Sequence, residues 1–168
     1  MKIKIVKAKK TDLNILNKEL SVKEILWFHE EKLKEQEKGK SMWLIAWKNN
    51  HPIGHVQVRF NGSKITKVKS NLKNCPHIES LGVKEDYRKK GVGTKLMNYA
   101  ENLVKKKGYK KVGLAVEKRN LFLEKLYFKR GYKNWGKGIV IDSWYVLNKK
   151  RNKQKVSEKC NYFIKTLK

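Results

Sequence analysis

Arginine, cysteine and long apolar runs are all scarce in this chain, and each scarcity narrows the range of functions. Five of the 42 basic residues are arginines, so lysine carries nearly all of the net charge of +27. Because arginine makes the bidentate contacts to phosphates and bases, we do not expect a nucleic-acid partner. The two cysteines, Cys75 and Cys160, are too few for a disulfide framework and too far apart in sequence for a metal-binding motif. A reducing, cytoplasmic environment and no metal are therefore expected.

Membrane-directed segments are also missing from the pattern. The longest apolar run, Trp43 to Trp47, is too short to span a bilayer, and the first ten residues lack the apolar core of a signal peptide. We therefore expect no membrane association. The length of 168 residues and the hydrophobic fraction of 39% favour a single domain over 1–168. The basic segment 151–168 is expected to dock on this domain as an extension, through apolar residues near its end.

Apolar periodicity predicts an α/β fold with about seven strands and four helices. Strands are expected over 2–8, 42–47, 53–60, 77–83, 112–116 and twice within 132–147. Helices are expected over 12–20, 21–38, 92–107 and 120–131. The polar residues 61–73 are expected to form a loop.

The chain is organised around one strand, a glycine-rich turn and a helix, over residues 77–96. The turn Arg88–Gly93 reads R-K-K-G-V-G, and glycines there allow tight backbone angles and close approach to a ligand. Its N–H groups would meet phosphate oxygens at the positive end of the helix dipole. No glycine follows Gly93 at the spacing of a Rossmann turn, and the Walker order is also absent. The turn is thus a candidate pyrophosphate site, with an ordinary strand-to-helix turn as the alternative.

A second segment, N120-L-F-L-E-K-L-Y127-F-K-R-G-Y132, follows about thirty residues later. With L81-G-V83 and the turn, it resembles the GNAT superfamily of acetyl-CoA-dependent N-acetyltransferases, with Leu123 where alanine is common. The resemblance extends from about Ile3 to Leu147. It implies a mixed, twisted sheet that splays between its fourth and fifth strands, with acetyl-CoA as the acetyl donor in the cleft.

The resemblance also implies which residues bind the cofactor. Backbone groups of the central strand would hold the pantetheine arm and the thioester carbonyl, and the turn would hold the pyrophosphate. Asn120 would contact the cofactor from the other side. The implied cofactor-binding residues are Leu81, Gly82, Val83, Arg88, Lys89, Lys90, Gly91, Val92, Gly93, Thr94, Asn120 and Tyr127.

Three residues are candidates for catalysis. An attacking amine must be neutral, so a base or a water chain to a base is needed. His77 and Glu79 lie two residues apart on the strand expected over 77–83, so their side chains point to the same face. Some family members carry the base at these positions, and Glu79 lies nearer the thioester. Glu79 could equally bind a cationic amine, and His77 could be an ordinary strand histidine. Tyr127 occupies the family's position for a proton donor to the CoA thiolate, since a phenol with a pKa of about 10 is protonated at neutral pH; the alternative is a core tyrosine.

The leading prediction is an enzyme that transfers acetyl from acetyl-CoA to a primary amine of a small molecule. Transfer would occur by direct attack in a ternary complex, in a monomer or homodimer. One alternative is acetylation of a protein N-terminus or lysine. Another is a non-catalytic acyl-CoA-binding or RNA-associated module.

Overall fold

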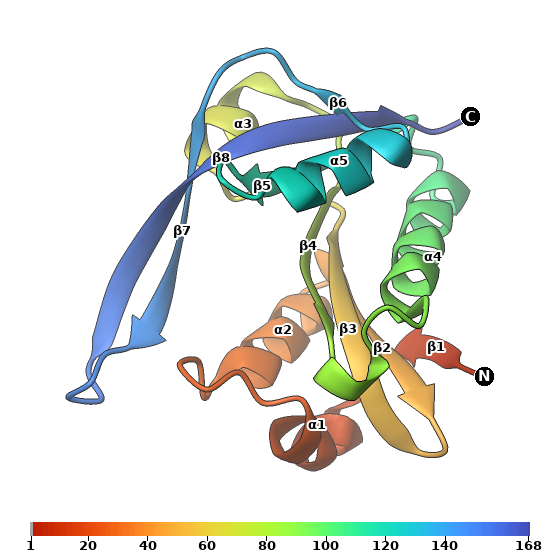
Figure 1. Cartoon of the computed structure of the whole chain (residues 1–168), viewed down its shortest axis with the longest axis vertical. Helices are drawn as coiled ribbons and strands as arrows, with labels where there is room; N and C mark the ends of the chain where they lie inside the picture. Colours follow the sequence, from red (N-terminus) through yellow and green to blue (C-terminus); the bar gives the residue numbers. More distant parts are fainter. Residues whose placement is uncertain (1) are drawn as a thin grey trace. The chain divides into compact units, whose positions relative to one another are not determined.

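The computed structural model describes residues 2–168, whose contacts group into two compact units. Unit 1 holds the residues up to Arg59 together with Ile78–Leu103, and unit 2 holds Phe60–His77 and Val104–Lys168. The predicted organisation as one domain stays a prediction. Figure 1 traces both units in the colours of the sequence.

Unit 1 is built on four neighbouring strands. These are β1 (Lys4–Lys7), β2 (Ser41–Lys48), β3 (His51–Arg59) and the part of β4 (His77–Val83) that follows His77, in that order. The β1–β2 and β2–β3 pairs are antiparallel. Asn49 and Asn50 join β2 to β3 with φ angles of 49° and 62°, the left-handed geometry that two-residue hairpins require and that asparagine tolerates. The strands expected over 42–47 and 53–60 are therefore confirmed as a hairpin.

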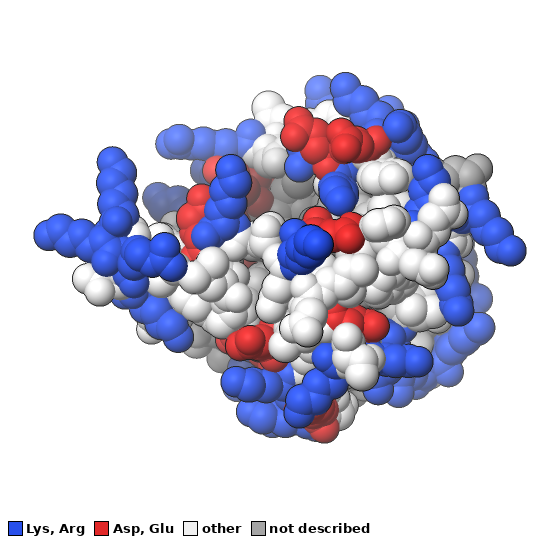
Figure 2. All heavy atoms as spheres, turned by 90° about the horizontal axis from the view of Figure 1, so that it is seen from below, with Lys and Arg blue, Asp and Glu red and all other residues white. Residues whose placement is uncertain are grey.

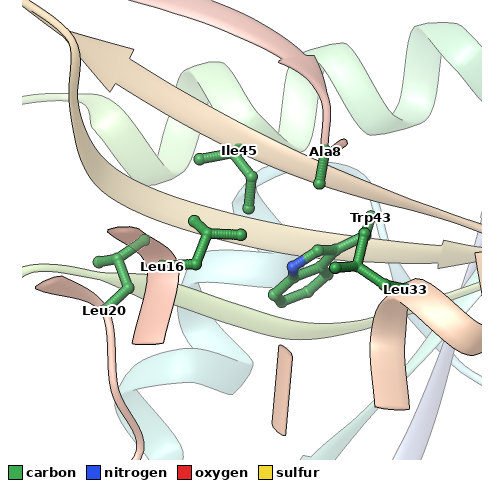
Figure 3. Packing of buried hydrophobic residues seen from close by; sticks show 6 residues of the cluster. All are labelled: Ala8, Leu16, Leu20, Leu33, Trp43 and Ile45. Atoms are coloured by element: carbon green, nitrogen blue, oxygen red, sulfur yellow. The ribbon is translucent and has the colours of Figure 1, made fainter. Parts of the chain in front are cut away.

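Two helices supply the core of unit 1. The side chains of α1 (Leu13–Glu19) and α2 (Phe28–Glu37) pack with β2, and Trp43 is fully buried. Figure 3 shows its indole among the aliphatic side chains around it. The cluster consists of Ala8, Leu16, Leu20, Leu33, Trp43 and Ile45.

Unit 2 is built around the last strand, β8 (Lys153–Thr166), which is drawn in dark blue in Figure 1. This strand pairs antiparallel with β5 (Lys111–Glu117), β6 (Lys133–Asn134) and β7 (Val140–Leu147). The core of the unit includes Val140, Cys160 and Tyr162. They pack with Val68 of α3 (Thr66–Asn71) and with Ile65, which precedes that helix. The fifth α-helix is α5 (Leu121–Lys129).

The strand, turn and helix expected from residue 77 onward are formed by β4, the turn 88–91 and helix α4 (Val92–Lys106). At its first residue β4 pairs in parallel with β5, His77 opposite Gly113, and both residues belong to unit 2. This parallel pair, beside antiparallel neighbours, confirms the predicted mixed sheet. Along α4 the residues Val92, Leu96, Ala100 and Val104 are buried at helical spacing.

The described residues form eight strands and five α-helices, one more of each than predicted. The polar loop expected over 61–73 contains α3, and the lysine-rich end contains the long strand β8. The helix expected over 21–38 begins only at Phe28. Its first part forms turns instead, because the carbonyl of Leu20 bonds Nε2 of His29 rather than a helical amide.

Candidate functional site

The predicted site residues lie in both units, and each set is described within its own unit. Unit 1 holds Glu79, the strand residues 81–83 and the turn 88–94. Unit 2 holds His77, Asn120 and Tyr127.

The turn before α4 has the backbone geometry of an anion site. Lys89 and Gly91 have φ angles of +57° and +79°, and backbone N–H groups converge in turns that place residues in the left-handed region. The first helical hydrogen bond runs from Lys95 N to Gly91 O, at 3.0 Å, so the amides of residues 92–94 precede it and have no intrahelical acceptor. A Cβ added at Gly91 would meet no atom within 4 Å. The glycine therefore serves the backbone angle and not a close contact, and the turn fits a diphosphate.

Three exposed cations accompany this turn. Arg88, Lys89 and Lys90 all lie at the surface. Arg88 Nε donates to the carbonyl of Val83 at 3.2 Å, which ties the turn to the end of β4. Lys90 lies over the ring of Tyr87, with its nitrogen 5.7 Å from the ring centroid. Positive charge at a helix N-terminus strengthens the attraction for phosphate oxygens.

Strand β4 is bent at Ser80, and His55 of β3 lies against this bend. Ser80 has a φ angle of +54°, which is unusual for a non-glycine residue. Its carbonyl oxygen is 2.7 Å from Nδ1 of His55, so that nitrogen carries the proton and donates. A Cβ at Gly82 would come within 2.5 Å of the His55 ring. Gly82 is therefore required for the close approach of β3 and β4 beside Leu81 and Val83.

Burial keeps His55 uncharged near neutral pH. Desolvation lowers the pKa of its imidazole to about 4, against the opposing hydrogen bond to Ser80. Its ring packs on Trp43, with centroids 4.8 Å apart, and on His29 at 5.9 Å. Burial also lowers the pKa of His29. This histidine pair supports the strand and does not reach solvent as a base.

Glu79 is held by a lysine on α2. Its Oε1 accepts a hydrogen bond from Lys32 Nζ at 3.0 Å, and the two side chains are 24% and 13% exposed. The same ammonium donates to Oε1 of Gln57 on β3 at 2.6 Å. The candidate base in unit 1 is thus a half-buried carboxylate in an ion pair.

His77 has a different environment in unit 2. Its ring is 3% exposed and stacks on Tyr162 of β8, with centroids 5.7 Å apart and planes 10° apart. Nδ1 of His77 and the hydroxyl of Tyr162 are hydrogen-bonded at 3.0 Å. The histidine is therefore buried and bonded to an aromatic partner, rather than a partly exposed strand residue.

Asn120 and Tyr127 both belong to α5. Asn120 caps the helix, because its Oδ1 accepts from the backbone amide of Leu123 at 3.1 Å. Tyr127 is 6% exposed and its ring meets Tyr132 edge to face, with centroids 5.5 Å apart. The helix expected over 120–131 is confirmed, while the roles of Asn120 toward the cofactor and of Tyr127 as an acid stay predictions.

Sequence reasoning missed the polar partners of the candidate bases, which are Lys32 with Gln57 in unit 1 and Tyr162 in unit 2. Lys32 lies 47 residues from Glu79, and Tyr162 lies 85 residues from His77. No local pattern marks such pairs in the sequence. The residue type alone gives no signal either, because lysine is abundant throughout the chain.

The described surface is strongly basic. Figure 2 shows lysine and arginine side chains spread over the drawn face, with acidic side chains gathered in a few places among them. Within residues 2–168, no helix combines the length and the apolar character needed to cross a membrane. Over the same residues, no cluster of three or more His, Cys, Asp or Glu could hold a metal ion.

Comparison with known proteins identifies the family. Residues 13–132 match the model of the acetyltransferase (GNAT) family. The chain belongs to this family. Streptothricin acetyltransferase A of Bacillus subtilis (strain 168) is 32% identical over 93 residues, which are 55% of this chain and 46% of that protein. The matched part is thus about half the length of that relative.

Solved N-acetyltransferase structures share the fold over nearly the whole chain. The PaiA N-acetyltransferase from Thermoplasma acidophilum, in complex with coenzyme A, superposes with a TM-score of 0.65 at 18% identity, covering 99% of this chain and 100% of that one. An N-acetyltransferase from Staphylococcus aureus Mu50 superposes with a TM-score of 0.69 at 15% identity, covering 100% of both chains. These matches and the family membership confirm the predicted GNAT fold. The match to the family model also confirms the predicted family of acetyl-CoA-dependent N-acetyltransferases.

Proposed function

We propose that this GNAT family member acetylates a primary amine of a small molecule, using acetyl-CoA. The observation that carries the choice of acceptor is the 32% identity with streptothricin acetyltransferase A, whose name specifies a small-molecule acceptor. Acetyl-CoA supplies an activated acetyl group as a thioester, and the amine attacks it directly in a ternary complex.

The turn before α4 is the proposed diphosphate site. The amides of Val92, Gly93 and Thr94 donate to the phosphate oxygens, and Arg88, Lys89 and Lys90 offset their charge. Backbone groups of Leu81 and Val83 bind the pantetheine arm. The bend at Ser80 and the missing side chain at Gly82 support this proposal, because both shape the backbone where the arm is expected.

Glu79 is the proposed base. The ammonium form of an amine has no lone pair for attack, so a proton must leave before or during the reaction. A carboxylate accepts that proton directly or through a water molecule, and it also attracts the ammonium form electrostatically. The contact with Lys32 supports this assignment, since it holds the Glu79 carboxylate in a defined orientation. His77 remains the second candidate.

Tyr127 is the proposed proton donor to the departing thiolate. This role rests on its place in the segment 120–132 that carries the family resemblance. Burial of the ring, at 6% exposure, is compatible with a hydroxyl that donates to sulfur in a site shielded from water. The phenylalanine variant separates the hydroxyl from the ring, because the packing on Tyr132 is retained.

The deciding experiment measures CoA thiol release from acetyl-CoA with a broad amine panel at near-physiological salt. Wild type is compared with Tyr127→Phe and Glu79→Gln, and with Lys34→Ala, an exposed position on α2, as the control. We expect amine-dependent release that falls at least about ten-fold in Tyr127→Phe and Glu79→Gln. Thiol release with peptides but with no small amine would favour acetylation of a protein N-terminus or lysine instead. Saturable acetyl-CoA binding without release would favour a non-catalytic binding module.

A further inference from the structure

Lys32 is held on three sides in unit 1. Its Nζ donates to Oε1 of Glu79 at 3.0 Å and to Oε1 of Gln57 at 2.6 Å. The same nitrogen lies 5.5 Å from the centroid of the Phe28 ring, one helical turn earlier on α2. Two oxygen acceptors and an aromatic face form a site for an ammonium ion, and the side chain of Lys32 fills it.

Gln57 is oriented by groups deeper in the unit. Its side chain is fully buried, and its Nε2 donates to Oε2 of Glu35 at 2.8 Å and to Oγ of Ser41 at 3.1 Å. An amide whose nitrogen meets two acceptors must direct its oxygen the other way, and that oxygen faces Lys32. Glu35 is in turn fixed by Arg59, whose Nη1 is 2.7 Å from the same Oε2.

These contacts form one continuous chain of charged and polar groups from the interior to Glu79. Its order is Arg59, Glu35, Gln57, Lys32 and Glu79, with charges that alternate around the neutral amide. A carboxylate held only by solvent samples several rotamers, whereas one bonded to an immobilised ammonium does not. The bond to Lys32 thus restricts the rotamers of Glu79, and the bond to the buried amide restricts those of Lys32.

We infer that Lys32 is a positioning residue for the reaction, which fixes the Glu79 carboxylate in the orientation that receives the acceptor amine. The inference rests on the proposed function, because it gives Lys32 its role through Glu79. Lys32 acts through another group and is not assigned contact with the reacting atoms. Misplacement of a catalytic group by about 1 Å costs about 100-fold in rate, so the loss of this contact should be visible in kcat.

The test uses the full chain, acetyl-CoA and an amine that wild type acetylates in the panel above. Lys32→Ala is compared with Lys34→Ala, which removes the same charge from an exposed position of the same helix. We expect Lys32→Ala to lower kcat about ten-fold or more, with the KM for acetyl-CoA within about two-fold of wild type. Lys34→Ala should leave both unchanged.

Two further readouts separate positioning from a structural role. In a Glu79→Gln background, Lys32→Ala should cost no more than about a further two-fold, because the group that it orients is already lost. Ethylammonium added to Lys32→Ala should fill the vacated site and restore kcat in a concentration-dependent way, but not in the double variant. Product is followed by the mass of the acetylated acceptor, since ethylammonium is itself an amine. A purely structural lysine would change the melting temperature without this coupling or rescue.

Each outcome decides between the two proposals. If Glu79→Gln lowers turnover and Lys32→Ala does not, the inference is overturned and the proposed function stands. If the losses from Lys32→Ala and Glu79→Gln are additive and ethylammonium restores nothing, the inference is overturned but the proposed function stands. Wild-type turnover in Glu79→Gln removes the role of Glu79 and, with it, that of Lys32, while acetyl transfer stands. Absence of turnover with every amine overturns the proposed function and the inference that rests on it.

Discussion

The two candidate bases of β4 lie two residues apart but have environments of different kinds. Glu79 in unit 1 belongs to a chain of charged groups that begins at Arg59 and passes through Lys32. His77 in unit 2 is stacked on Tyr162 and bonded to its hydroxyl. Glu79 is thus bonded to a charged side chain, whereas His77 is bonded to an aromatic one. These partners make a direct comparison possible between Glu79, the proposed base, and His77, the second candidate.

The first prediction compares these two residues directly. Glu79→Gln should lower kcat/KM about 100-fold, at the low end of general base effects, with little change in stability. His77→Phe keeps the stack but removes a hydrogen bond from Tyr162, so it should destabilise the fold by about 1 kcal/mol and lower kcat/KM less than about three-fold. Steady-state kinetics and urea unfolding measure both variants. If His77→Phe lost more activity than Glu79→Gln, the assignment of the two residues would be reversed.

The second prediction contrasts His55 with a surface histidine of the same hairpin. The pKa of His55 is about 4 in the folded protein, against an ordinary value of 6.5. Below pH 6.5 His55 is protonated in the unfolded chain but stays neutral in the folded protein until the pH nears 4. The free energy of unfolding should therefore fall as the pH falls from about 6.5 to about 4. The full loss is about 3 kcal/mol, and the lowered pKa of His29 acts in the same direction.

Urea unfolding of wild type, His55→Gln and His51→Gln between pH 7 and pH 4 measures this dependence. We expect His55→Gln to lose most of the wild-type slope, and His51→Gln, at a side chain that is 63% exposed, is the matched control for replacing a histidine of this hairpin. Parallel curves for all three proteins would contradict the neutral, buried state of His55.

The contrast between local and distant contacts also explains how much the sequence could predict. The strand, turn and helix from His77 to Lys106 follow from periodicity and glycine spacing within thirty residues, and the structure confirms them. Strand β8 was missed because its exposed lysines, such as Lys153, Lys155 and Lys159, interrupt the apolar alternation that indicates a strand. Its partners β5 and β7 decide its structure. The Lys32–Glu79 pair joins residues 47 positions apart, so it emerges only once α2 and β4 are folded together.

The third prediction concerns the N-terminus of α4 in unit 1. Gly91 has a φ angle of +79°, whereas Gly93 has an ordinary angle, and a Cβ there would meet Val83 Cγ2 at a comfortable 3.7 Å. Gly91→Ala should therefore cost about 1–2 kcal/mol of stability and weaken acetyl-CoA binding, since relief of the strain would move the amides. Gly93→Ala is the matched control for folding and should stay within about 0.5 kcal/mol of wild type. Thermal unfolding and calorimetric titration with acetyl-CoA measure both, and equal stability of the two variants would contradict the role given to the turn.

The fourth prediction concerns the N-terminus of α5 in unit 2, which carries its own cap. Asn120 Oδ1 already accepts a hydrogen bond from the amide of Leu123, so the side chain of Asn120 caps its own helix. Among residues 88–94, no side chain caps the amides at the start of α4 in this way. Asn120→Ala should cost about 1 kcal/mol, and Asn120→Asp, which keeps the capping oxygen, should cost less. If Asn120 also binds the cofactor, the affinity for acetyl-CoA will fall in Asn120→Asp although the cap is retained, because the amide nitrogen is lost. Unchanged affinity in Asn120→Asp would restrict this residue to capping and leave the α4 turn as the part of the chain that binds the diphosphate.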